Sequence, residues 1–301
     1  MKNILNASIL CALLQTPSHA EEGLKDVSGK HLDILRDGKA FARYMYAYDK
    51  STKDTRHNTY KPFLHVMDEE GKAPITKGPG GKYTHHRGIF LGWSKLSFQG
   101  KSYDMWHMKS SEIVHKEFLE QTVSEAATVV KVRLHWLTPD DTVMIDEVRT
   151  FTFHHTDTDA HLLLDFHSVL TAPTDEVNLN GDPEHAGMQY RPHNDVVGNK
   201  SAKYVFHKEG ANAQADRDWP WAALTYKLKD KFYTVQHMNH PSNPKGTRYS
   251  AYRDYGRFGA FAVSKIKKDE SLTLQYRIRV QLGEAPERDV FAAQYQSYLK
   301  N

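Results

Sequence analysis

The chain has a single cysteine among its 301 residues, and this residue, Cys11, lies within the first twenty. Residues 21–301 therefore contain no disulfide and no cysteine nucleophile. A fold of about 280 residues must then be held by its hydrophobic core alone, which is feasible because a chain of this size buries roughly three quarters of its surface. Long apolar runs are also lacking, so we expect no membrane span.

The first twenty residues have the composition of a secretory signal. Lys2 is the only charged residue before an apolar run over 4–14, and small residues at 18 and 20 occupy the two positions that a signal peptidase reads. The apolar run is too short to span a membrane. We therefore predict that residues 1–20 are a signal peptide, that residues 21–301 form one catalytic domain, and that the protein is periplasmic or secreted.

Neither sign of charge is in large excess. The chain has 40 basic and 37 acidic residues and a formal net charge of +3. A nucleic-acid-binding protein would show a basic face and a strongly basic isoelectric point, so we expect no nucleic-acid partner. The sequence also has no pattern typical of a helix that lies on a membrane surface. It does not indicate an oligomeric state.

Several patterns of known catalytic sites are absent. No Gly-x-Ser-x-Gly elbow occurs, which argues against a serine hydrolase. There is no HExxH pattern and no Cys/His finger spacing. Histidine is nevertheless a common metal ligand, so we predict no cofactor and leave a divalent metal as an open alternative. The glycine-rich segment 78–81 lacks the lysine and the helix of a phosphate-binding loop and reads as a flexible turn.

Alternation of apolar and polar residues dominates the rest of the chain. The segments 130–136 and 271–280 have an apolar residue at every second position, which is the period of a half-buried antiparallel strand. Further strands are predicted over 31–35, 41–48, 89–93, 113–119, 147–153, 162–170, 202–207, 222–227 and 232–237. Turn clusters separate them, and only the tail, about 286–299, reads as a helix. The pattern predicts an all-β fold, a large antiparallel β-sandwich with a short C-terminal helix.

The most informative stretch runs from Tyr83 to Trp93. It places His85, His86 and Arg87 side by side ahead of a glycine and an apolar, strand-like tail. An imidazole can give or take a proton near neutral pH, and a guanidinium binds carboxylates through a planar fork of donors. A polar turn before a buried strand is the simpler interpretation of any one of these residues. Three such groups together, in a chain with 18 histidines, favour a site.

Three more clusters of polar residues lie at predicted strand ends or in loops, where binding residues tend to occur. They span 104–107, 184–194 and 237–256, and they could converge on the first cluster at one face of a sheet. Their candidate site residues are Trp106, His107, His185, Arg191, His240, Asn243, Arg253 and Tyr255. Separately, alternation places Asp165 and His167 on one face of a strand, either as an acid/base pair or as a solvated surface.

The motifs resemble a family of secreted bacterial proteins that carries the label methane oxygenase PmoA. The resemblance covers most of residues 21–301. It rests on Lys61-Pro62-Phe63, His85-His86-Arg87-Gly88, Asp104-Met105-Trp106, Gln189-Tyr190-Arg191-Pro192, His240-Pro241-Ser242-Asn243-Pro244 and Arg253-Asp254-Tyr255-Gly256. The chain has Ser250 where that family often has tryptophan. The label itself does not fit, because a membrane methane monooxygenase subunit needs several membrane spans.

The resemblance implies a relative of the galactose-mutarotase type of β-sandwich, with an oligosaccharide as substrate and a dehydratase or lyase as activity. Our first hypothesis is therefore β-elimination on a uronate- or keto-type sugar. Elimination needs a base, a cation for the developing enolate and an acid for the leaving oxygen. The residues assigned to these roles are His85 or His86 as base; Arg87 with Arg191 or Arg253 as carboxylate clamps; His185, His240 or Tyr255 as acid; and Asn243, Trp106 and His107 as sugar contacts.

Two other functions fit the same residues. A mutarotase or epimerase would need a histidine and a carboxylate on either side of a ring oxygen, and Glu184 or Asp165 could supply the carboxylate. A glycan-binding protein without activity would depend on aromatic platforms and neutral hydrogen-bonding groups. The many imidazoles favour an enzyme over such a binding protein.

Overall fold

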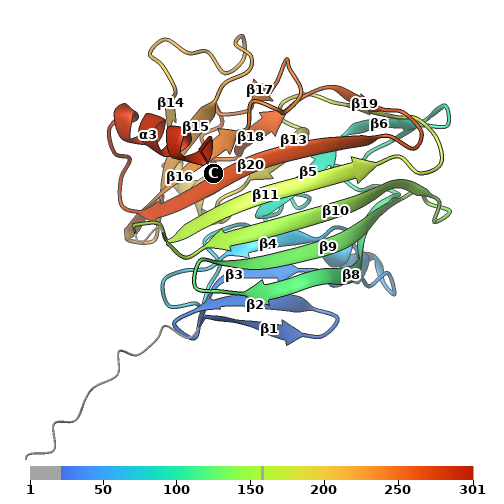
Figure 1. Cartoon of the computed structure of the whole chain (residues 1–301), viewed down its shortest axis with the longest axis horizontal. Coiled ribbons are helices and arrows are strands. Elements are labelled where there is room, and N and C mark those ends of the chain that lie inside the picture. Colours follow the sequence, from blue (N-terminus) through green and yellow to red (C-terminus); the bar gives the residue numbers. More distant parts are fainter. Residues whose placement is uncertain (1–21, 157–158, 301) are drawn as a thin grey trace, which may run out of the picture.

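Two eight-stranded antiparallel sheets make up most of the computed structural model, which describes residues 22–156 and 159–300 (Figure 1). The predicted signal peptide lies outside the described residues. The first sheet consists, in spatial order, of β1 (Gly23–Val27), β2 (His31–Arg36), β3 (Lys39–Met45), β4 (Phe63–Val66), β5 (Ile89–Trp93), β13 (Ala186–Tyr190), β18 (Phe258–Phe261) and β17 (Arg248–Tyr249).

The second sheet packs face to face against the first. It consists, in spatial order, of β14 (Lys203–Phe206), β15 (Trp221–Leu228), β16 (Lys231–Asn239), β20 (Ser271–Leu282), β11 (Leu162–Thr171), β10 (Val143–His154), β9 (Ala127–Leu137) and β8 (Glu112–Val123). The core lies between the two, where Tyr44 of β3 packs on Phe151 of β10 with ring centroids 5.3 Å apart. The predicted all-β sandwich is confirmed.

Smaller elements complete the structure. A four-stranded sheet consists of β19 (Ser264–Ile266), β12 (Val177–Asn180), β6 (Lys95–Phe98) and β7 (Lys101–Tyr103). The predicted C-terminal helix is present as α3 (Arg288–Tyr298), which covers the outer face of β15 and β16 (Figure 1). Two short helices, α1 (Lys53–Thr59) and α2 (Asp195–Asn199), were not predicted. No helix in the described part of the chain is long and apolar enough to cross a membrane.

Strands with one solvated face follow the predicted alternation. Along β11, Leu162, Leu164 and Phe166 are buried in the core, while Asp165 and His167 lie on the other face. Asp165 does not pair with His167. Its carboxylate lies 2.8 Å from His154 Nε2 and accepts hydrogen bonds from Arg277, which makes a local ion-pair network on the outer face of the second sheet.

The centre of the first sheet behaves differently, because loops cover its outer face. Every residue of β4, β5, β13 and β18 is buried, and of these four strands only β5 was predicted. On this outer face Phe63 and Phe90 pack beneath Trp106, which comes from the loop after β7. The loop lies directly on β5, since the Met105 amide donates to the Trp93 carbonyl at 2.8 Å.

Gly92 makes that close approach feasible. A Cβ added at Gly92 would lie only 2.5 Å from the Met105 carbonyl oxygen. We therefore expect Gly92→Ala to lower the free energy of unfolding by about 1–3 kcal/mol, because the loop or the strand must shift. Urea unfolding of both proteins would measure the difference.

Gly198→Ala is the matched control, because a Cβ added there, within α2, meets nothing within 4 Å. It should leave the stability unchanged or raise it by about 0.4–1 kcal/mol. A Gly92→Ala protein as stable as the wild type would contradict the direct contact between the loop and β5.

Candidate functional site

Four histidines from three loops lie in contact over the covered face of the first sheet. His85 and His86 precede β5, His107 follows β7, and His185 precedes β13. The ring centroids are 4.4 Å apart for His85 and His86, 4.4 Å for His85 and His107, and 5.3 Å for His107 and His185. Tertiary structure thus brings together the first three polar clusters of the sequence.

Two of these imidazoles are held neutral. His86 is only 3% exposed, and its Nδ1 and the Nε2 of His85 are buried without a hydrogen-bond partner. Burial and then the positive charge of Lys61 lower the pKa of His85 to about 2. Burial and the nearby basic groups lower the pKa of His86 further still. Both rings can exchange hydrogen bonds with a ligand but are poor proton acceptors near neutral pH.

The other two histidines are built alike, each from an Asp-x-x-His turn. His107 Nδ1 lies 2.8 Å from Asp104 Oδ2, and His185 Nδ1 lies 2.9 Å from Asp182 Oδ1. Each aspartate also accepts a backbone N–H of its own turn, from His107 at 2.8 Å and from Glu184 at 3.0 Å. The two imidazole side chains are 31% and 39% exposed. A carboxylate at Nδ1 orients the ring and leaves Nε2 for a reacting group.

Buried cations surround this cluster. They are Lys61, Lys77, Arg87, Arg191 and Arg257, none more than 2% exposed. Lys61 Nζ donates to the Trp106 carbonyl at 2.7 Å, and burial lowers its pKa well below the usual range. The Arg87 guanidinium donates to the carbonyls of Thr84, His86 and His57 at 2.6–2.8 Å, so it fixes the loop that carries His85.

A network around Glu184 closes one side of the site. Arg253 donates to both oxygens of this carboxylate at 2.5–3.0 Å, and the Tyr252 hydroxyl donates to one of them at 3.0 Å. Arg257 Nη2 lies 3.5 Å from the same carboxylate. Sequence reasoning missed Arg257, although it is the second arginine of the segment that begins at Arg253. The network anchors the loop that holds His185.

The aromatic residues at the site differ in exposure. Trp106 is fully buried, with its ring 6.1 Å from His86 and 6.2 Å from His185. Tyr255 lies against Arg191, and its ring centroid is 4.8 Å from that of Tyr83. Tyr83 is 36% exposed, so it presents the open aromatic surface.

Residues 31–296 match the model of a family of unknown function, DUF6807. The chain belongs to this family. The family description names no activity, so the methane label of the sequence resemblance gains no support from it. No curated protein matches the chain.

Solved structures show only weak likeness to this DUF6807 protein. A protein described as a kojibiose phosphorylase from the human microbiome has 5% identity and a TM-score of 0.38, over 94% of this chain and 36% of its own. The ligand-free α-N-acetylgalactosaminidase NagBb from Bifidobacterium bifidum has 11% identity and a TM-score of 0.33, over 92% of this chain and 37% of its own. This chain spans little more than a third of either protein, and likeness at this level says nothing about activity.

Two predicted site residues of this DUF6807 member lie elsewhere. His240 Nδ1 is 2.6 Å from the Ser242 hydroxyl, and its ring is 5.6 Å from Tyr298 of α3. Asn243 donates to Asn239 and to the Gln275 carbonyl, and accepts from the Gln275 amide at 2.8 Å. Neither has a hydrogen bond or ring contact with the four clustered histidines in the described structure.

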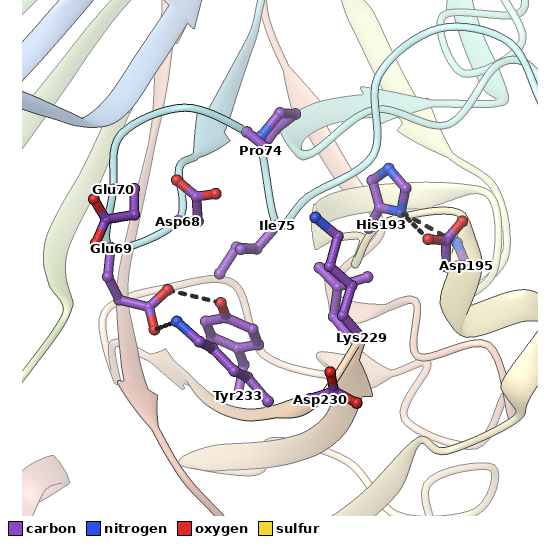
Figure 2. Close-up of a pocket in the computed structure, with 13 residues that line it drawn as sticks. Asp68, Glu69, Glu70, Pro74, Ile75, His193, Asp195, Lys229, Asp230 and Tyr233 are labelled. Atoms are coloured by element: carbon purple, nitrogen blue, oxygen red, sulfur yellow. Dashed lines mark hydrogen bonds and ion pairs between the residues drawn. The ribbon is translucent and has the colours of Figure 1, made fainter.

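A separate cavity of about 290 Å³ lies between the loop after β4 and the turn joining β15 to β16 (Figure 2). None of its lining residues belongs to the histidine cluster. Glu69 at its wall already accepts a hydrogen bond from Lys231 at 2.7 Å. It also accepts one from the Tyr233 hydroxyl at 2.9 Å, and this contact is drawn in Figure 2. Within residues 22–156 and 159–300, no three His, Cys, Asp or Glu side chains are arranged to hold a metal ion.

The low pKa of His85 makes stability depend on pH. Its imidazole takes a proton in the unfolded chain below about pH 6.5 but in the folded protein only near pH 2. The unfolded state therefore binds more protons in this range, and stability falls as the pH is lowered from 6.5 towards 2. We expect His85→Gln to reduce the slope of unfolding free energy against pH by up to about 1.4 kcal/mol per pH unit.

Urea unfolding between pH 4 and pH 7 would measure that slope. Tyr83→Phe is the control, because it alters a neighbouring ring without removing an imidazole. An unchanged slope in His85→Gln would contradict a neutral, half-buried His85.

Proposed function

We propose that this protein is a periplasmic or secreted enzyme that acts on oligosaccharides by β-elimination, as a lyase or dehydratase, on a uronate- or keto-type sugar. The observation that carries the proposal is the pairing of two open imidazoles, each oriented by an aspartate, with a buried surplus of positive charge. The first group moves protons, and the second stabilises the negative charge that forms next to a carbonyl or carboxylate. The sequence resemblance supports a sugar as substrate.

His107 and His185 are the acid and the base of this proposal. Their rings lie 5.3 Å apart, and an aspartate at each Nδ1 can stabilise the imidazolium that forms when Nε2 takes a proton. One ring removes the proton from carbon, and the other protonates the leaving oxygen. His85 and His86, which stay neutral, supply hydrogen bonds to the substrate instead.

The sugar ring itself needs an amphipathic surface. Tyr83 has this role in the proposal, because its ring is exposed at the rim while Trp106 is fully buried beneath the histidines. Tyrosine offers an apolar face for a sugar and a hydroxyl for its polar edge. Trp106 supports the site from below by packing on Phe90.

A mutarotase or epimerase is the second candidate. Two imidazoles on either side of a ring oxygen would also suit that reaction. The carboxylates first considered for it are engaged elsewhere: Glu184 in its network with Arg253 and Tyr252, and Asp165 with His154 and Arg277. The placement of both carboxylates therefore favours elimination.

Mass spectrometry on the protein incubated with uronate-containing and neutral oligosaccharides tests the proposal. We expect a dehydration product lighter than the substrate by one water, or cleavage to a product with a new double bond. His107→Gln and His185→Gln should each lower kcat by about 10²–10⁴-fold, because each removes one proton-transfer group. His167→Gln, on the outer face of the second sheet, is the matched control and should retain full activity.

The other outcomes are informative. A product of unchanged mass, seen as a change of anomer or epimer by NMR, would replace elimination by isomerisation. Saturable sugar binding without any product would make the protein a glycan-binding module. Loss of activity in EDTA would indicate that the histidines are metal ligands and not proton-transfer groups.

A further inference from the structure

The arginines at the site differ in how their hydrogen-bond donors are used. Arg87 donates through both Nη groups to backbone carbonyls, and Arg253 is paired with Glu184. Arg191 is anchored on one side only, where Nη1 donates to the carbonyls of Pro192 at 2.9 Å and Tyr255 at 2.8 Å. Its Nε and Nη2 are buried and have no hydrogen-bond partner among residues 22–156 and 159–300. Those two atoms form the parallel donor edge that binds a carboxylate in a bidentate manner.

More buried nitrogen atoms without a partner in the described structure belong to side chains near Arg191, and one of these, His86, lies against the same Tyr255 ring. Arg257 Nε is buried without a partner, although Arg257 Nη1 contacts Gln189 Oε1 and Ser250 Oγ, each at 3.3 Å. His86 Nδ1 is also buried without a partner. Burial, reinforced by the charge of Arg257, lowers the pKa of Arg191 to about 10, so the two guanidinium groups feel each other's charge. Buried polar groups are nearly always hydrogen-bonded, and exceptions call for a ligand or an ordered ion.

The charge balance points to an anion. The five buried basic side chains face few carboxylates: Glu184 is shared between Arg253 and Arg257, and Asp104 pairs with His107. A buried charge without a counter-charge is strongly destabilising. We propose that the free edge of Arg191, with Arg257 and His86 beside it, binds the carboxylate of a uronate residue.

Two tyrosines cover this site. The Arg191 guanidinium lies 4.9 Å from the centre of the Tyr255 ring, and Tyr83 packs on Tyr255 from the solvent side. Tyr83 has a φ of 56°, a left-handed conformation that is strained in a residue other than glycine. It follows Gly80 and Gly81, which also have positive φ. In this proposal the segment 80–83 moves first and separates the Tyr83 ring from the Tyr255 ring. The carboxylate then reaches Arg191.

This inference rests on the proposed function. Of the two sugar types named there, a carboxylate site at Arg191 selects the uronate over the keto sugar. A carboxylate held by Arg191 makes the hydrogen on its neighbouring carbon acidic. The base takes that proton, the electron pair of the C–H bond forms a carbon–carbon double bond, and the bond from the next carbon to its oxygen breaks. The leaving oxygen takes a proton from the second imidazole. No oxidant or cofactor enters the balance.

Binding can be tested without turnover, by NMR of the arginine Nε–H groups. A buried Nε–H gives a slowly exchanging signal, and loss of one signal in Arg191→Lys assigns it. The probes are D-glucuronate and D-galacturonate, with D-glucose and D-galactose as neutral counterparts and inorganic sulfate as a second anion. We expect the uronates to shift the Arg191 signal and the neutral sugars to leave it in place.

Affinity for the uronates should fall about tenfold to a hundredfold in Arg191→Lys, which keeps the charge but loses the fork. Arg257→Lys is a second test if the first variant folds poorly. Arg133→Lys, on β9 of the second sheet and paired with Glu117, is the matched control and should bind as the wild type does. Tyr83→Ala should raise the rates of both association and dissociation, since it removes part of the cover and also the proposed contact surface for the sugar.

Uronates that leave the Arg191 signal unmoved would overturn the inference. Sulfate that binds where the uronates do not would overturn the substrate class, because it would indicate a sulfated sugar. Uronate binding at Arg191 without any product would keep the carboxylate site and overturn the lyase. Elimination from a neutral keto sugar, unaffected in Arg191→Lys, would keep the lyase and overturn this site.

Discussion

The loop after β7 rests directly on β5, and this contact holds the centre of the candidate site in place. The backbone of the loop after β7 touches β5 at Gly92, where no side chain larger than a hydrogen fits. That contact lets Trp106 pack on Phe90 and fixes the position of the histidines above the sheet. Burying both faces of the strands leaves little freedom for the loops, because well-packed interiors do not deform gradually. The imidazoles are therefore positioned by packing as much as by hydrogen bonds.

The four histidines are of two kinds, which differ in their surroundings and in their hydrogen-bond partners. His85 and His86 lie deep, next to cations, and remain neutral. His107 and His185 lie further out, where aspartates orient them. In the proposed function, one cluster of identical side chains thus supplies both hydrogen-bonding groups and proton-transfer groups. The two kinds differ because burial and neighbouring charges determine which protonation state of each imidazole is favoured.

The same electrostatics explains why the deep part of the site is positive. Backbone carbonyls accept hydrogen bonds from both Nη groups of Arg87 and from Lys61 Nζ, so these basic side chains hold loops in place through carbonyls and not through carboxylates. The carboxylates are held at the edge, in Glu184 and Asp104. An anion that binds next to positive charge in a region of low dielectric is stabilised more than it would be in water, because the attraction is less screened. The positive charge of the site therefore complements the anionic substrate class that we propose.

Alternation along β9, β11 and β20 let the sequence determine the sandwich, because one face of each of these strands lies in the core and the other is more exposed. The cluster at His85 to Arg87 and the segments around His107, His185 and Arg191 were also visible in the sequence, since they are local runs of reactive side chains. The strands β4, β13 and β18 were not, because residues buried on both faces show no alternation.

Only the tertiary structure decided which polar residues share a site. It brought Arg257 and the Asp182–His185 turn to the cluster and placed His240 beside α3. Sequence spacing cannot report such neighbours, because they depend on how far loops reach across a sheet. It also decided which arginine keeps a free edge, since that depends on the carbonyls and carboxylates around each guanidinium. The residue types set the available chemistry, and packing assigned each one its place.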